Sequence, residues 1–175
     1  YIKPYKLIPK DIEEKTKITN EMVKDKPNKF YILPKLREFI GDNIVVAHNA
    51  KFDVDFLNFW FMKLRLPVIK KHICTMKTFK KITERKKNLT LTHACEYFDV
   101  ELLQAHSAIE DTKATAQVFI KEMDYNVFEL EENTDEDVFI RIKKRLYKST
   151  PYKKVREELC TDGLVLGRRR KIEKL

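Results

Sequence analysis

The chain has 175 residues, of which 43% are hydrophobic and 36% are charged. This length and composition suit a single compact domain with a hydrophobic core, and they exclude a disordered polar tail and a fibrous repeat. No apolar run approaches the roughly 20 residues that cross a bilayer, so we expect no membrane-spanning helix and no membrane partner.

The net charge indicates which kind of partner the protein could bind, and the cysteines indicate the redox state of its compartment. The 36 Lys and Arg residues outnumber the 27 Asp and Glu residues, which gives a net charge of +9. A polyanionic partner is therefore worth considering, although lysine-rich surfaces often serve only to keep a protein soluble. The cysteines are odd in number and widely spaced, which argues against a disulfide framework or a zinc site and favours a reducing, cytoplasmic location. They are Cys74, Cys95 and Cys160.

Hydrophobic periodicity and capping residues predict alternating strands and helices. We expect strands at residues 1–9, 43–47 and 68–74, and helices from Thr19 and at 28–40, 52–64, 75–82, 90–98 and 108–123. Gly41 is a typical helix end. Pro34 disfavours a helix interior, so the helix around it is expected to kink or to start near it. The mixed order of elements indicates an α/β or α+β class.

The character of the sequence changes after Met123. Residues 129–137 include six acidic and no basic side chains, and residues 141–148 include five basic and no acidic ones. Such blocks are typical of a solvated linker followed by an exposed amphipathic helix. We therefore expect a domain at residues 1–124, an acidic linker at 125–137 and a short basic, helical C-terminal extension at 138–175.

The first segment that points to chemistry is the run VVAHNAKFD, residues 45–53. A buried strand leads into a loop with His48 and Asn49, and Asp53 then falls in the first turn of the next helix. Helix capping alone would also explain an Asn or Asp at this place, because both residues are favoured near a helix N-terminus.

The second segment is the run HSAIEDTKAT, residues 106–115. His106 precedes the long helix, and Asp111 lies inside it among small residues that let a ligand or another backbone approach. The alternative is a carboxylate that the helix dipole favours, beside a solvated histidine.

Separated carboxylates and a histidine are what metal-assisted phosphodiester hydrolysis requires. Carboxylate oxygens suit Mg²⁺, and two such ions can clamp the attacking and leaving oxygens. A histidine can take the proton from the attacking water at neutral pH. The two segments together therefore favour a metal-dependent nuclease.

The motifs HNAxFD and HxAxxDxxAT, in this order and about fifty residues apart, resemble those of the DnaQ-like (DEDDh) 3′–5′ exonucleases. This family includes the proofreading subunit or domain of bacterial DNA polymerase III. Weaker matches at residues 8–27, 74–76 and 88–98 extend the resemblance, which covers residues 1–123. It implies an α/β, RNase H-like exonuclease fold with a mixed sheet flanked by helices.

The resemblance also implies roles for individual residues. Asp111 corresponds to a direct metal ligand, Asp53 to an acid near the metals, and His106 to the general base. Two Mg²⁺ or Mn²⁺ ions are expected in the complete site. The residues that correspond to contacts with the terminal nucleotide are Ile18, Thr19, His48, Asn49 and Phe52.

The sequence departs from the family at the first motif. That motif, D-x-E on the first strand, supplies the other two metal-binding acids and is expected upstream of Tyr1, so the fold is expected to lack its N-terminal strands here. The run Asp11-Ile12-Glu13 has the same letters, but it follows Pro9 in a predicted turn and comes after the segment that should be third. We interpret it as a coincidence.

The sequence therefore predicts a 3′–5′ exonuclease of the proofreading or DNA-repair type. Its expected substrate is single-stranded DNA or a frayed 3′ end, with a DNA polymerase as a candidate partner. Two alternatives stay open. One is a catalytically incomplete nucleic-acid-binding or scaffold fragment, which the missing D-x-E supports. The other is an RNase of the same fold, because a 2′-OH contact could come from several polar loop residues.

Two further expectations concern packing. His72 stands beside Lys70 and Lys71 and is expected at the surface. The aromatic residues between Phe52 and Phe61 recur at helical spacing and are expected in the core.

Overall fold

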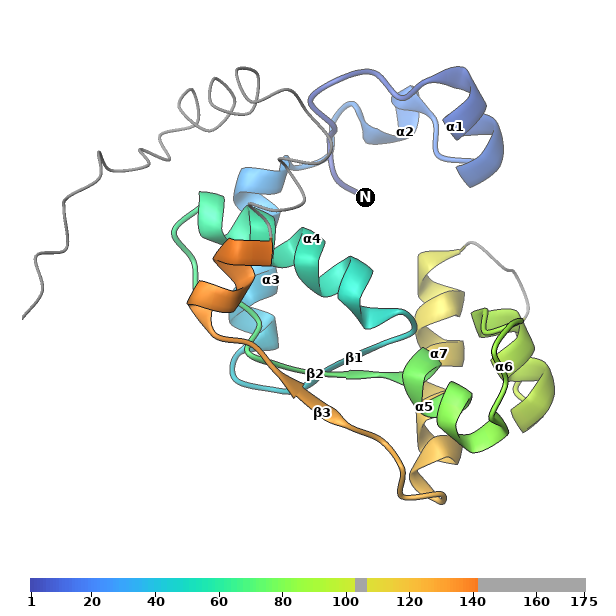
Figure 1. The fold of residues 1–175 in the computed structure, drawn as a ribbon. Coiled ribbons are helices and arrows are strands. Elements are labelled where there is room, and N and C mark those ends of the chain that lie inside the picture. Colours follow the sequence, from blue (N-terminus) through green and yellow to red (C-terminus); the bar gives the residue numbers. More distant parts are fainter. Residues whose placement is uncertain (103–106, 142–175) are drawn as a thin grey trace, which may run out of the picture.

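The computed structural model describes residues 1–102 and 107–141, and it contains one small sheet flanked by helices (Figure 1). The elements in chain order are α1 (Lys10–Thr16), α2 (Asn20–Val23), α3 (Lys29–Ile40), β1 (Val45–Ala47), α4 (Ala50–Lys63), β2 (Lys71–Cys74), α5 (Thr75–Thr83), α6 (Leu91–Phe98), α7 (Ala108–Met123) and β3 (Leu130–Glu132). Within the described ranges, no helix is both long and apolar enough to cross a membrane.

The sheet is mixed, as the sequence predicts. Its strand order is β1-β2-β3, with β1 parallel to β2 and β2 antiparallel to β3. In the parallel pair Val45 lies opposite His72 and Ala47 lies opposite Cys74. A parallel pair needs a crossover connection, and α4 provides it. The α/β class with helices around a mixed sheet is therefore confirmed.

Two hydrophobic clusters fill the interior. One joins α3, α4 and the sheet, with Leu33, Val54 and Phe61 at its centre. The other joins α5, α6 and α7, with Phe79 and Val118 fully buried. Figure 1 shows the helices of the two clusters at opposite ends of β1 and β2. The strands therefore connect two helical packing units.

The cap predicted at Thr19 is present, and two further helices have capping side chains at their starts. The side chains of Thr19, Asn28 and Thr90 accept hydrogen bonds from backbone N–H groups in the first turns of α2, α3 and α6. Pro34 lies inside α3, five residues after the helix begins, so the helix does not start near it. Gly41 ends α3 with a positive φ of 52°, a conformation that other residues rarely adopt.

The N-terminal strand predicted at residues 1–9 is wrong. Only Lys3 forms a bridge, with Asn28, and residues 10–16 form α1 instead. Pro4 and Pro9 explain the difference, because proline cannot donate to a strand ladder, and Pro9 precedes the first turn of α1.

The run Asp11-Ile12-Glu13 lies on α1 and not on a strand. The Glu13 carboxylate accepts hydrogen bonds from the backbone N–H and the side-chain amide of Asn20, at 2.6 and 2.8 Å. The Asn20 side chain in turn bonds the backbone N–H and C=O of Ile8. Glu13 therefore holds the N-terminal segment together, and these letters are not a first-strand motif.

The acidic segment differs from the predicted solvated linker, because it contains β3. Glu129 and Glu131 flank Leu130 and pair with Lys81 and Lys77 on α5; Lys77 Nζ lies 2.6 Å from the Glu131 carboxylate. Farther along, Val138 is fully buried. The acidic side chains thus meet a basic helix, and the domain continues past residue 124. Residues 142–175, most of the predicted basic extension, lie outside the described residues.

His72 is buried and not at the surface, with 4% of its area exposed. Its Nδ1 accepts a hydrogen bond from the Asn133 side-chain amide at 3.1 Å, and its Nε2 lies 3.8 Å from the Glu131 carboxylate. The neighbouring lysines misled the prediction, because β2 is the central strand of the sheet and is buried from His72 to Cys74.

Glu122 is a fully buried acid on α7. Burial raises the pKa of its carboxyl group to about 8, although the backbone of Phe79 opposes part of the shift. A buried carboxylate is costly without a partner, so this group is protonated in the folded protein at neutral pH.

Replacing Glu122 by Gln should remove a pH dependence of stability. Folding raises the pKa of Glu122. The contribution of this group to the stability of the parent is therefore fully present below about pH 4.5 and is lost as pH rises toward 8. We expect Glu122→Gln to unfold at higher denaturant concentration than the parent at pH 8, by several kcal/mol, and to differ little at pH 4.5. An equal difference at both pH values in urea titrations would contradict this account.

Candidate active site

An open cleft of about 680 Å³ lies between the end of β1 and α7. Its wall includes both acids singled out in the sequence, Asp53 from α4 and Asp111 from α7. The other lining residues are Val46, Ala47, His48, Leu91, Ala108, Thr112, Thr115, Ala116, Phe119 and Ile120. The fold therefore brings together two carboxylates that are 58 positions apart in the chain.

Asp53 reaches the cleft because the chain turns sharply after β1. Asn49, the residue before α4, has a left-handed conformation with φ of 64°, and Asp53 follows in the first turn of α4. Asn tolerates this conformation better than most residues. Partial burial raises the pKa of the Asp53 carboxyl, while its own backbone N–H opposes the shift. A cation in the cleft would favour the ionised form.

Asp111 lies in the first turn of α7. Its backbone N–H donates to the Ser107 carbonyl at 2.8 Å, which starts the helix. The partial positive charge at a helix N-terminus favours a carboxylate there. The small side chains of Ala108 and Thr115 line the cleft beside Asp111. They leave the carboxyl group accessible from the cleft, as the sequence predicts.

His48 joins three parts of the cleft wall. Its Nε2 lies 2.8 Å from the Leu89 carbonyl, to which it donates, and its Nδ1 accepts from the hydroxyl of fully buried Thr75 at 3.0 Å. Desolvation by burial lowers the pKa of the imidazole, and the Leu89 carbonyl opposes this. The ring nitrogens are thus used within the protein, while the side chain still lines the cleft. Its predicted contact with a nucleotide stays a prediction.

Phe52 lies on an exposed part of α4, and so does Phe56 one turn later. Their exposed fractions are 58% and 57%, so the prediction that these two rings belong to the core is wrong. Phe61, by contrast, is fully buried. Asn49 is also exposed. Two of the five residues predicted to contact a nucleotide, Asn49 and Phe52, are accordingly accessible.

Besides Asn49 and Phe52, which do not line the cleft, three further predicted site residues are not placed there by the described structure. Ile18 and Thr19 lie in the N-terminal segment before α2 and are not among the lining residues; the Thr19 hydroxyl accepts from the Met22 N–H. His106 lies outside the described residues. The expected roles of all three stay predictions.

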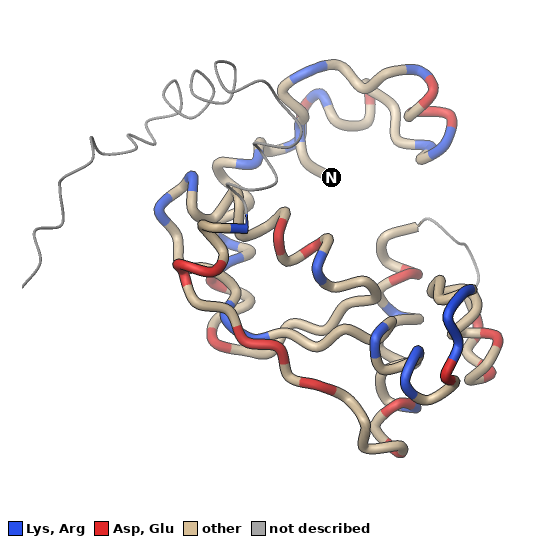
Figure 2. Tube along the Cα trace, viewed as in Figure 1, with Lys and Arg blue, Asp and Glu red and all other residues tan. Residues whose placement is uncertain are grey.

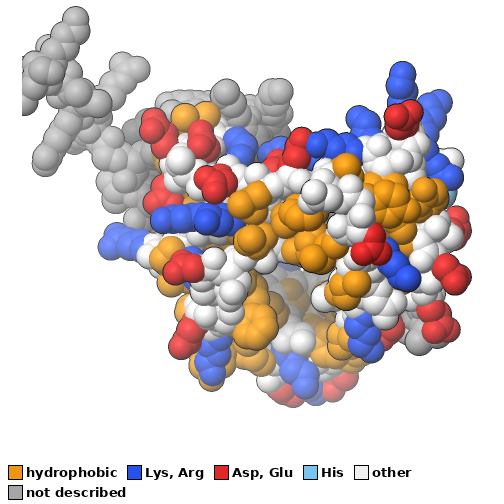
Figure 3. Space-filling model, turned by 90° about the horizontal axis from the view of Figure 1, so that it is seen from below, with side chains coloured by type: hydrophobic (Ala, Val, Ile, Leu, Met, Phe, Trp, Pro, Cys, Tyr) orange, Lys and Arg blue, Asp and Glu red, His pale blue; other side chains and the backbone are white. Residues whose placement is uncertain are grey.

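The cleft also has an apolar part that sequence reasoning missed. Leu91, Phe119 and Ile120 line it beside Val46 of β1. Figure 3 shows exposed hydrophobic side chains around a hollow on the face seen from below. Among the described strands β1 pairs only with β2, which leaves its other edge open. Helical periodicity puts Val118 and Phe119 on the apolar side of α7. It does not show that Val118 is buried in the core while Phe119 lines the cleft.

The donor atoms in the cleft suit a hard divalent cation. Mg²⁺ is often held by one or two carboxylates and keeps several of its waters, so Asp53 and Asp111 are a chemically suitable pair. Within residues 1–102 and 107–141, no group of three or more Asp, Glu, His or Cys side chains is arranged to hold a metal ion. A complete two-metal site therefore needs further ligands.

Replacing His48 by Ala should loosen the cleft wall. The Thr75 hydroxyl and the Leu89 carbonyl would lose their partner, and such a loss costs about 1 to 3 kcal/mol for buried groups. We expect urea denaturation at pH 7.5 to detect this decrease. Because the pKa of His48 is lowered, the difference from the parent should shrink as pH falls below 6.5. His93→Ala on α6, where the ring hydrogen-bonds the exposed Thr90 hydroxyl of the same cap, is the matched control and should cost less. Equal losses in the two variants would contradict the bridging role.

Comparison with known proteins identifies the family of this chain. Residues 1–119 match a family model described as Exonuclease. The chain is 40% identical over 121 residues to "DNA polymerase III PolC-type" of Caldanaerobacter subterraneus subsp. tengcongensis. This match covers 69% of this chain and 9% of that protein. The chain is 35% identical over 119 residues to "DNA polymerase III subunit epsilon" of Aquifex aeolicus. This match covers 67% of this chain and 59% of that protein. The chain thus spans less than two thirds of the length of these relatives.

A solved structure shares the fold. "Exonuclease X in complex with 5′ overhanging duplex DNA" matches with a TM-score of 0.55 and 24% identity, over 78% of this chain and 75% of that chain. At this identity the likeness supports the fold alone. The family resemblance that the two sequence motifs predict is confirmed by the family model and the relatives together: this chain belongs to the exonuclease family.

Proposed function

We propose that the cleft hydrolyses phosphodiester bonds at DNA 3′ ends, in the 3′–5′ direction and by a two-metal mechanism. The observation that carries the proposal is that Asp53 of α4 and Asp111 of α7 both line one cleft. A family of exonucleases supports the reaction class. The names of the relatives support DNA as the substrate and a DNA polymerase as the partner.

The residues of the chain divide the chemical work. Asp111 and Asp53 would hold the cations through their carboxylate oxygens. Mg²⁺ or Mn²⁺ bound there would supply Lewis-acid stabilisation of charge on the scissile phosphate. His106 accepts the proton of the attacking water. His48 keeps β1, α5 and the α5–α6 loop in fixed positions around the site.

Two further carboxylates would complete the ligand set. We propose that they lie on a strand beside the open edge of β1, where the apolar side chains of the cleft would pack against it. The open edge offers unpaired backbone groups to such a strand.

A second candidate function rests on the number of acids present. Asp53 and Asp111 are the acidic side chains that line the cleft in the described part of the chain. Two carboxylates without the D-x-E pair fit a domain that binds nucleic acid or a protein partner without cleaving. DNA binding without metal-dependent cleavage, in a protein that carries the acidic strand, would favour this function.

Asp111→Asn should abolish cleavage and leave the fold intact. Asn keeps the size of the side chain but loses the charge that a hard cation requires. We expect no Mg²⁺-dependent release of nucleotides from single-stranded DNA, with an unchanged circular dichroism spectrum, in the protein form that carries the D-x-E strand. Asp99→Asn is the matched control, because Asp99 is an exposed residue at the end of α6 in a conformation that Asn also adopts. Digestion by Asp111→Asn at the parent rate would exclude Asp111 as a ligand.

His106→Ala should lower turnover by about 10²- to 10⁴-fold, the usual contribution of a positioned general base. DNA affinity should change less, because a neutral imidazole contributes little to phosphate binding. The parent should gain activity as pH rises through the pKa of the histidine, and the variant should lose this dependence. Comparable turnover with an unchanged pH profile would assign His106 to the surface and exclude it as the base.

A further inference from the structure

The loop between α5 and α6 carries three consecutive basic residues, Arg85, Lys86 and Lys87, which we call the basic loop. All three are exposed. Figure 2 shows a blue stretch beside the position that α6 has in Figure 1, and the acidic Glu84 precedes Arg85 in the sequence. Three cations next to one another on a short loop repel each other, so this arrangement favours a binding partner of opposite charge.

The neighbouring lysines of α5 differ, because acids of β3 already neutralise them. Lys77 pairs with Glu131, and Lys81 pairs with Glu129. Within the described residues no acidic side chain forms an ion pair with the basic loop. Its charge is therefore available to a ligand, whereas the charge on the β3 side of α5 is not.

The basic loop is also held in place. The guanidinium of Arg85 lies 5.9 Å from the ring centre of Phe79 and 5.8 Å from that of Tyr97, within range of a cation–π interaction. Two residues after Lys87, the Leu89 carbonyl accepts the hydrogen bond from His48. An anchored loop loses little entropy when it binds.

The anchor places the basic loop next to the cleft. His48, which holds Leu89, lines the cleft together with Leu91 and the two acids. Lys86 and Lys87 thus stand a few residues before a cleft wall. A strand of nucleic acid whose 3′ end lies between Asp53 and Asp111 has further phosphates to place at the rim.

We propose that the basic loop binds backbone phosphates of single-stranded DNA whose 3′ end occupies the cleft. The inference rests on the proposed function, and it adds a substrate-binding surface outside the two motifs. Lysines bind phosphates as point charges without reading bases, so the loop would give affinity without sequence preference.

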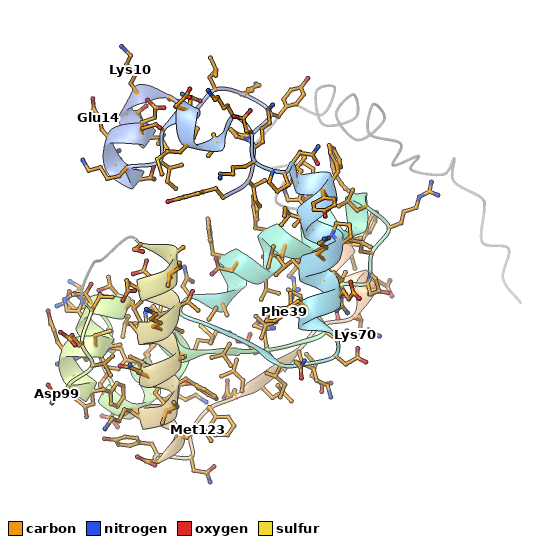
Figure 4. All side chains as sticks on the ribbon, turned by 180° about the vertical axis from the view of Figure 1, so that it is seen from behind. Lys10, Glu14, Phe39, Lys70, Asp99 and Met123 are labelled. Carbon is orange, nitrogen blue, oxygen red and sulfur yellow. The ribbon has the colours of Figure 1, made fainter. Side chains whose placement is uncertain are left out.

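The test measures DNA binding separately from cleavage. Binding of a fluorescent oligothymidine to the full chain is followed by anisotropy in EDTA over a range of KCl concentrations. The variant is Lys86→Gln/Lys87→Gln. The matched control is Lys70→Gln/Lys71→Gln, which removes the same charge from two exposed lysines. Figure 4 shows Lys70 on the other side of the molecule from Asp99, which ends α6.

We expect the basic-loop variant to bind roughly fivefold more weakly or worse, while the control binds as the parent does. Because two phosphate contacts are lost, the slope of log K against log[KCl] should become shallower by roughly 1.4. Equal weakening of both variants would mean that only net charge matters, and parent-like binding by the variant would remove the loop from the interface. Either result overturns the inference, as does a parent that does not bind.

A cleavage assay in Mg²⁺ of the same variants, made in the protein form that carries the D-x-E strand, distinguishes the two proposals. Loop-dependent binding without cleavage by the complete site rejects the exonuclease function and keeps the binding surface. Cleavage together with DNA binding that does not depend on the basic loop would support the exonuclease function and reject the basic loop as a DNA-binding surface.

Discussion

The shape of the cleft depends on the two hydrogen bonds of His48. The residue follows β1, whose Val45 and Ala47 pack in the cluster of α3 and α4, and its partner Leu89 packs against the cluster of α5, α6 and α7. Its bond to Thr75 adds the first residue of α5. One imidazole therefore ties together both packing units at the place where they meet.

Most of the fold was predictable where local signals agree. The bounds of α7 are those predicted, and α3 to α6 differ from the predictions by a few residues, because apolar spacing and capping side chains point to the same ends. The failures come from interactions between distant segments. Residues 130–132 have the composition of a linker, and they form a strand only because β2 offers an edge and α5 offers lysines. No local pattern contains that information.

The site was predictable in part for a related reason. Asp53 and Asp111 stand near helix starts, and two helices that begin at the same end of a sheet bring such residues together. The exposure of Phe56 was not predictable, since helical spacing shows which rings share a side but not which side faces the core. The double role of His48 as lining residue and bridge required the position of Leu89, which is 41 residues away in the chain.

The distribution of charge connects the fold to the proposed function. The acidic side chains of β3 lie against α5 and neutralise Lys77 and Lys81, so the sheet edge formed by β3 carries little free positive charge. Exposed ion pairs of this kind stabilise the fold only weakly, but they have a second effect. A polyanion attracted to a chain with a net charge of +9 finds fewer available cations at that edge. The available cations of the basic loop stand instead beside the cleft, where the anchoring bond to His48 orients them. Long-range attraction would therefore bring a strand of nucleic acid toward the two carboxylates, even though those carboxylates repel phosphate until cations are bound between them.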